Sequence, residues 1–376
     1  MKQRKTGRQA FFCGVFALTV AIAASGSIQA EAVTPAKNNY AQQAARGIQR
    51  LQQWYEPGKG LYKTPTGWWN SANSITVLVD YSRATGTKRY LSTITNTFAR
   101  ANKANGSKDF ITDSNDDAGW WALAWIDAYD LTKNPAYLKA AEILFADLTT
   151  QWDTTTCGGG IWWSKNRPRE SYKNAVTNEL FLAIGASLAN REEDAAKRAK
   201  YRDWAQKEWN WFRHSGMING QHLINDGLKA TNPKACTNNG QTTWTYNQGV
   251  VLGGLVELHN ATGDATLLPA AEQIAHAAMK HLVTMGGILH EPRMAGPDQP
   301  QFKGIFVRNL VKLNKAAARA EYKAFVLRNA QSILTRDSAN CPQCEFGVLW
   351  KGPFDAADAT RQTSALDALI GAMEQK

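Results

Sequence analysis

Cysteine is scarce in this chain, with five residues in 376, and this excludes a small scaffold held together by dense disulfides. No apolar run reaches the ~20 residues needed to cross a bilayer as a helix. Lysine and arginine form no block interleaved with aromatic residues, so nucleic acid is not an expected partner. Hydrophobic residues at 44% and charged residues at 20% are typical of a globular protein.

The chain also lacks the short motifs of several enzyme classes. Its six histidines form no HExxH pattern, and there is no GxSxG elbow, no P-loop and no strand-flanked GxGxxG. Cys341 and Cys344 have the spacing of half a zinc site, but nothing nearby completes it. These absences disfavour metallohydrolases, serine hydrolases and nucleotide-binding enzymes, and we expect no metal and no cofactor.

Residues 1–30 have the pattern of a secretory signal peptide. Four basic residues precede an apolar run over 10–24, and small residues lead to an expected cleavage site near Ala30. A membrane anchor is the alternative, but the run is short for one. Cleavage removes four positive charges, so the formal net charge falls from +11 to +7. We therefore expect a secreted protein, extracellular or periplasmic, with no membrane contact after cleavage.

Four cysteines remain after cleavage of the signal. They are Cys157, Cys236, Cys341 and Cys344, an even number in an exported chain. We expect one or two structural disulfides, with the pairing left open.

Helical periodicity dominates from residue 40 onward. Strand-like alternation is short and confined to stretches near 158–163 and 346–350. The expected amphipathic helices cover 40–54, 70–84, 88–104, 117–131, 135–151, 173–190, 194–213, 245–261, 265–284, 303–315, 319–335 and 359–373.

The links between these helices alternate between two kinds. Short polar turns, such as 84–87 and 261–264, close helix pairs, whereas longer Gly- and Trp-rich links join one pair to the next. The helix after each long link is the more apolar of its pair. Six apolar helices inside six polar ones satisfy this pattern, which predicts an all-α (α/α)6 toroid. An irregular helical array is the alternative. No linker divides residues 31–376, so we expect a single domain and a monomer.

Two adjacent acids, Asp116 and Asp117, stand where a long loop meets an apolar helix. Retaining glycosidases use two carboxyl groups about 5–5.5 Å apart, one as nucleophile and one as acid/base. The start of a helix favours ionisation of one acid, and repulsion raises the pKa of the other. Capping of the helix is the ordinary alternative.

Aromatic and polar residues gather at the same expected end of the helices. Flat aromatic faces suit sugar rings, and amides and cations bind hydroxyls, although core packing or helix capping could account for any single residue. The set comprises Trp68, Trp69, Trp120, Trp162, Asn73, Asn174, Asn178, Gln248, Lys303 and Arg308.

The sequence closely resembles glycoside hydrolase family 76, the endo-α-1,6-mannanase family, over about residues 40–370. The matching stretches are 116–124, 158–163, 172–180, 245–249, 302–308 and 362–365. The resemblance implies an (α/α)6 fold and retaining, endo-acting hydrolysis of α-1,6-mannan, which would be the partner. It places the nucleophile at Asp116 and the general acid/base at Asp117, and Tyr246 joins the expected sugar-binding set. The four cysteines lie outside the family pattern.

Two rival functions remain at this point. A cell-wall transglycosidase would use the same two acids with a sugar acceptor in place of water. A glycan-binding protein without catalysis is the other, and the presence of both acids argues against it.

Overall fold

Helices make up most of the part of the chain that the computed structural model describes, residues 37–166, 172–233, 235–294, 296–341 and 344–375. The expected signal peptide lies outside these residues. The helices are α1 (Lys37–Gln53), α2 (Trp68–Thr85), α3 (Leu91–Asn105), α4 (Asn115–Thr132), α5 (Pro135–Thr149), α6 (Ala175–Ala189), α7 (Ala195–Phe212), α8 (Thr245–Thr262), α9 (Leu267–His281), α10 (Gln299–Ala316), α11 (Ala320–Arg336) and α12 (Ala359–Met373).

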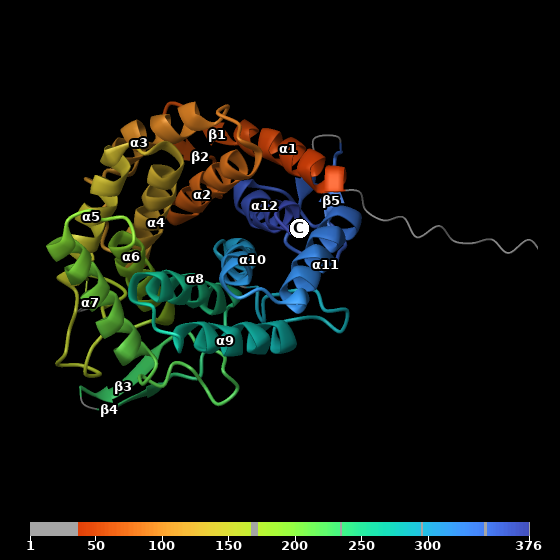
Figure 1. Ribbon diagram of the computed structural model, residues 1–376. Helices are drawn as coiled ribbons and strands as arrows, with labels where there is room; N and C mark the ends of the chain where they lie inside the picture. Colours follow the sequence, from red (N-terminus) through yellow and green to blue (C-terminus); the bar gives the residue numbers. More distant parts are fainter. Residues whose placement is uncertain (1–36, 167–171, 234, 295, 342–343, 376) are drawn as a thin grey trace, which may run out of the picture. The chain divides into compact units, whose positions relative to one another are not determined.

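The helices of unit Lys37–Lys376 form two concentric rings (Figure 1). Helices α2, α4, α6, α8, α10 and α12 each pack against the next, and α12 packs back against α2, which closes the inner ring. The odd-numbered helices pack outside them. The predicted all-α (α/α)6 toroid is therefore confirmed, and each helix end lies within four residues of its expected position.

The difference between the rings follows from composition. Every residue of inner helix α6 is buried, because its sequence AVTNELFLAIGASLA is apolar or small at all positions except Asn178 and Glu179. Outer helix α7, with the sequence AAKRAKYRDWAQKEWNWF, buries only four residues. An inner helix thus contacts protein on all sides, while an outer helix needs only one apolar stripe.

Strands are short and occur as antiparallel pairs among the described residues. The pairs are β1 (Tyr55–Glu56) with β2 (Leu61–Tyr62), β3 (Leu228–Asn232) with β4 (Ala235–Asn238), and β5 (Ser338–Ala339) with β6 (Glu345–Phe346). In β3–β4, Leu228 faces Asn238. The expected strand near 346–350 corresponds only to β6. The one near 158–163 was wrong, since the main chain there makes isolated bridges such as that of Ile161 with Trp152.

Two disulfides fasten the loops of this unit. Cys157 is bonded to Cys236 and joins the loop before α6 to the β3–β4 hairpin, and Cys341 is bonded to Cys344. No helix among the described residues is both long enough and apolar enough to span a bilayer.

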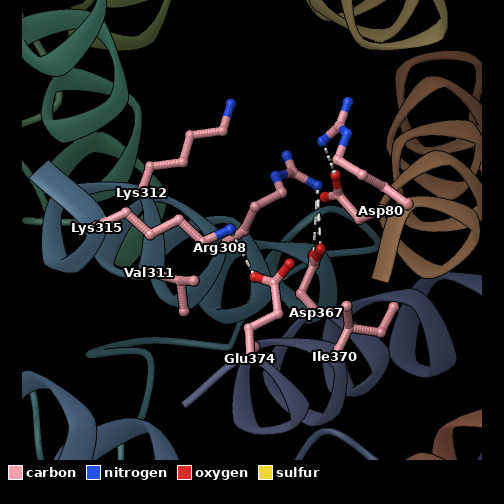
Figure 2. Close-up of a pocket in the computed structure, with 10 residues that line it drawn as sticks. Asp80, Arg308, Val311, Lys312, Lys315, Asp367, Ile370 and Glu374 are labelled. Atoms are coloured by element: carbon pink, nitrogen blue, oxygen red, sulfur yellow. Dashed lines mark hydrogen bonds and ion pairs between the residues drawn. The ribbon is translucent and has the colours of Figure 1, made fainter. Parts of the chain in front are cut away.

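The inner helices all run in the same direction, so the inner ring has two different ends. We call the end where they begin the mouth. At the far end, α2, α10 and α12 enclose a cavity of about 90 Å³ lined by charged side chains (Figure 2). Arg308 pairs there with Asp367 at 3.2 Å, and Arg83 with Asp80 at 2.9 Å.

Candidate active site

The first turn of α4 is fixed by the loop that precedes α6. The Asn115 amide nitrogen donates to the main-chain oxygen of Trp162 at 2.8 Å, and the Asn115 N–H donates to that of Trp163 at 2.8 Å. Next to them, the Lys165 N–H donates to the Asp113 carbonyl at 2.9 Å. These bonds place the loop alongside α4 and bring the Trp163 indole to the two acids.

Asp116 is a partly exposed carboxylate with two hydrogen-bond donors. Its Oδ2 accepts from the Trp163 Nε1–H at 2.9 Å, and its Oδ1 accepts from the Asp117 main-chain N–H at 2.9 Å. Burial raises the pKa of Asp116 to about 6, while these two donors oppose the rise. Its position in the first turn of α4 also favours the charged form. Asp116 is therefore suited to act as an anion near neutral pH.

Asp117 lies beside Asp116 in a different environment. Among the described residues no group hydrogen-bonds to its carboxyl. Burial raises its pKa well above the usual range, and the charges of Asp116 and Asp298 raise it further. Asp117 thus still holds its proton at a pH at which Asp116 is ionised. One of the two adjacent acids can therefore act as an anion while the other donates a proton.

Aromatic rings from four inner helices meet at the mouth. Trp69 of α2 stacks on Trp120 of α4 with ring centroids 5.4 Å apart, and Trp120 stacks on Tyr246 of α8 at 6.3 Å. Tyr246 in turn stacks on Phe302 of α10 at 3.8 Å. Trp120 lies one turn after the two acids, so this row of stacked rings, which we call the aromatic wall, lies beside them.

The other two expected tryptophans lie elsewhere. Trp68 packs against Trp121 at 4.7 Å and Phe110 at 6.0 Å, within the aromatic core between α2, α3 and α4. Trp162 is 8% exposed, and the Lys173 ammonium lies 4.9 Å from its ring. Of the Trp162–Trp163 pair, it is Trp163 that reaches Asp116.

The four expected amides, Asn73, Asn174, Asn178 and Gln248, are all buried. The Asn178 side chain accepts from the Ile161 N–H at 2.8 Å and donates to the Ile161 and Asn174 carbonyls. Gln248 makes the equivalent pair of bonds to the main chain of Ile224. Asn174 is the residue before α6, and its side chain makes no capping bond. In the structure, Asn178 and Gln248 each hold a loop of the mouth against an inner helix.

The two expected cations also bind protein groups. Lys303 is 2% exposed, and its ammonium donates to the Val348 carbonyl and lies 4.8 Å from the Trp350 ring. Burial lowers its pKa to about 8. Arg308 lines the far-end cavity (Figure 2), where it pairs with Asp367. Its other guanidinium nitrogen donates to Asn73 Oδ1 at 2.7 Å, below the mouth.

Two acids at the mouth were not expected from the sequence. Asp298 immediately precedes α10, and its Oδ1 accepts from the Trp69 indole N–H at 2.9 Å. Asp226 accepts from the Tyr172 hydroxyl at 2.9 Å, and burial raises its pKa. Asp298 could have been found, because it stands at the start of an inner helix, as Asp116 does. Asp226 lies in a long loop and carries no such signal.

The described residues offer no group of three or more His, Cys, Asp or Glu side chains placed to hold a metal ion. The chemistry that this arrangement supports is an acid–base pair beside an aromatic wall.

Comparison with known proteins assigns the chain to a family. The model of glycosyl hydrolase family 76 matches residues 36–376. The chain belongs to glycosyl hydrolase family 76. This family 76 chain is accordingly a glycoside hydrolase, and the resemblance noted in the sequence is confirmed.

Curated relatives of this family 76 protein are fungal. It is 25% identical over 357 residues to the mannan endo-1,6-alpha-mannosidase DFG5 of Candida albicans, over 86% of this chain and 77% of that one. It is 28% identical over 263 residues to protein C1198.07c of Schizosaccharomyces pombe, over 65% of this chain but only 58% of the length of that relative.

Solved structures share the fold of this family 76 protein. The alpha-1,6-mannanase GH76A of Salegentibacter sp. HEL1_6 matches with a TM-score of 0.80 at 23% identity, over 90% of this chain and 99% of that one. That structure is of an inactive variant in which two consecutive aspartates were replaced by alanine, in complex with alpha-1,6-mannotetrose. Protein Lin0763 of Listeria innocua matches with a TM-score of 0.78 at 27% identity, over 89% of this chain and 96% of that one.

Proposed function

We propose that this family 76 enzyme is a retaining, endo-acting α-1,6-mannanase with Asp116 as nucleophile and Asp117 as general acid/base. The observation that carries the proposal is the different hydrogen bonding of two adjacent carboxyl groups at the mouth. The Asp116 carboxylate has two hydrogen-bond donors that stabilise its anion. Asp117 has none, and burial and the Asp116 charge raise its pKa. A double displacement requires such a division between the two acids.

In the first step, the Asp116 carboxylate attacks the anomeric carbon while Asp117 transfers its proton to the glycosidic oxygen. The glycosidic bond breaks, and a mannosyl ester forms on Asp116. The Trp163 indole keeps Asp116 oriented for attack through its hydrogen bond to Oδ2. Loss of the negative charge from Asp116 lowers the pKa of Asp117 at this stage.

In the second step, Asp117 removes a proton from water, and the resulting hydroxide attacks the anomeric carbon of the ester. The ester bond breaks, Asp116 regains its charge and Asp117 regains its proton. Two inversions at one carbon give a product with the α configuration of the substrate.

Two findings support mannan as the substrate. The relatives with the longest matches bear the name mannan endo-1,6-alpha-mannosidase, and the inactive Salegentibacter variant holds an alpha-1,6-linked mannose oligomer. We assign the sugar-stacking role to Trp69 and Tyr246, the two partly exposed rings of the aromatic wall that stack on Trp120. Trp120 itself is 4% exposed and supports these two rings from between them. The other expected binding residues would act by supporting the mouth: Trp68, Asn73, Trp162, Asn174, Asn178, Gln248, Lys303 and Arg308.

The test is incubation of the enzyme with linear α-1,6-mannan oligomers of graded length, with NMR of the anomeric protons of the first products. Internal cleavage to α-configured products is expected. Asp116→Asn should abolish turnover while oligomer binding remains measurable by calorimetry. The control is Asp203→Asn, a substitution on outer helix α7. Wild-type turnover in Asp116→Asn would show that the nucleophile is assigned wrongly.

The same assay separates hydrolysis from transfer. With an added acceptor glycan, a transglycosidase gives lengthened chains and few new reducing ends. The proposed hydrolase gives reducing ends in proportion to the bonds broken.

We also propose that the enzyme acts outside the cytoplasm, after removal of residues 1–30. The two disulfides support this location, because such bonds form and persist in oxidising compartments. N-terminal sequencing of the protein recovered from its native host tests the cleavage site.

A further inference from the structure

Asp298 is one of two acids at the mouth to which the proposed mechanism gives no task. It comes from the start of α10, 229 residues away from Trp69 in sequence, yet its Oδ1 accepts the Trp69 indole N–H at 2.9 Å. The ring that it holds is part of the aromatic wall, stacked on Trp120 at 5.4 Å. Among the described residues, no group hydrogen-bonds to Oδ2 of Asp298, and its side chain is partly exposed at the mouth.

The charged and titratable groups around Asp298 come from two other inner helices. Asp116 and Asp117 belong to α4, and Tyr246 belongs to α8. The negative charge of Asp298 raises the pKa of all three. No cation is among the causes of the shifts at Asp116 and Asp117. Asp298 is thus an acidic neighbour that disfavours the ionised form of both members of the pair.

We propose that Asp298 is a positioning residue of the reaction, which fixes the Trp69 ring through Oδ1 and keeps a negative charge beside the Asp116–Asp117 pair during both displacements. This inference rests on the proposed function and extends it to a third carboxylate.

The value of a third charge follows from the sequence of steps. In the free enzyme, both Asp116 and Asp298 favour the protonated form of Asp117, which is the form that donates to the leaving oxygen. In the mannosyl ester the charge of Asp116 is gone, while that of Asp298 remains. The charge of Asp298 then still raises the pKa of Asp117. Ionised Asp117 is therefore a stronger base toward water than it would be without Asp298. Hydrolysis of the ester is the step that benefits.

Three variants separate the two tasks of Asp298. Asp298→Asn removes the charge and keeps a hydrogen-bond acceptor for the indole. Trp69→Phe removes the indole N–H and keeps both the ring and the charge. Asp298→Glu restores the charge. Asp113→Asn is the matched control, because Asp113 is an exposed acid in the loop just before α4. The measurement is kcat and KM on an α-1,6-mannan oligomer as a function of pH.

In Asp298→Asn, both limbs of the kcat/KM profile should move to lower pH, because both acids lose a repulsive neighbour. On the alkaline limb, kcat/KM relative to its maximum should fall about three- to fivefold below that of wild type. A change of this size is expected when one screened charge at close range is removed. Trp69→Phe should raise KM and leave both limbs in place. Asp298→Glu should return the limbs toward wild type, and Asp113→Asn should not move them.

The inference is overturned if the limbs of Asp298→Asn coincide with those of wild type, or if Trp69→Phe moves them equally. If Asp298→Asn does not fold, Asp298→Ser takes its place in the same comparison. Failure of the proposed function is a separate result, since wild-type enzyme would then leave every α-1,6-mannan oligomer intact.

Discussion

The substitution Asp116→Asn should make the protein more stable at neutral pH while it abolishes turnover. Burial raises the pKa of Asp116 from 3.8 to about 6 in the folded state. Because the pKa of Asp116 is higher in the folded state than in the unfolded state, the protonated carboxyl stabilises the fold. This stabilisation is lost as the pH rises from about 4 to 6. Above pH 6 the charged group costs roughly 3 kcal/mol, from about two pKa units at ~1.36 kcal/mol each.

Asparagine carries no charge and so removes that cost, but it accepts fewer hydrogen bonds than the carboxylate does. It keeps one oxygen to accept a hydrogen bond and turns its NH2 toward the other donor, so one of the bonds from Trp163 and Asp117 is lost. That loss costs roughly 1–2 kcal/mol. The net gain is about 1–2 kcal/mol above pH 6, which corresponds to a rise in Tm of roughly 2–4 °C for a domain of this size.

The assay is thermal unfolding of wild type and Asp116→Asn at about pH 7.5 and about pH 4. The variant should melt at a higher temperature at the first pH and at an equal or lower temperature at the second. Asp203→Asn is the control, because the Asp203 side chain is 66% exposed. The reasoning is refuted if the variant melts below wild type at pH 7.5, or if the difference does not change with pH.

Further expectations concern the pH profile, the acid/base, the indole donor and the hairpin disulfide. The kcat/KM of wild type should decline below about pH 6, where Asp116 takes up a proton, and a pH series checks this. Asp117→Ala should slow cleavage of mannan oligomers by about 10²–10⁴ but slow an aryl mannoside with an acidic leaving group far less, as seen in parallel kinetics. Trp163→Phe should lower kcat/KM about 10–100-fold and move its acidic limb to higher pH, because the Asp116 anion loses a donor. A variant with serine for Cys157 and Cys236 should lose roughly 4 kcal/mol of unfolding free energy in a denaturant titration.

Sequence periodicity predicts the architecture well for a physical reason. An inner helix that is packed on all sides, such as α6, is apolar or small at most positions, whereas an outer helix needs only one apolar stripe. Helices α6 and α7 show this contrast in their composition alone. The alternation of short and long links then fixes which ring each helix joins, so both rings are predictable without long-range information.

Side-chain direction at the mouth is not predictable in the same way. Both Trp162 and Trp163 were plausible, and the choice depends on the bonds of Asn115 to the main chain of that loop. Lys303 was expected to bind sugar, but a chain segment distant in sequence supplies the Val348 carbonyl that it binds. Asp298 reaches the pair only because the ring closes. Such contacts are set by tertiary structure and leave no periodic signal.

The closure of the inner ring by α12 has a consequence for biosynthesis. α12 fits between α10 and α2, and Ser74 bonds to Thr363 across 289 positions of sequence at 2.8 Å. Until α12 has been synthesised, α2 and α10 each lack a neighbour that they pack against in the closed ring. Contacts so far apart along the chain also form slowly. A nascent chain that still lacks α12 therefore cannot close its inner ring.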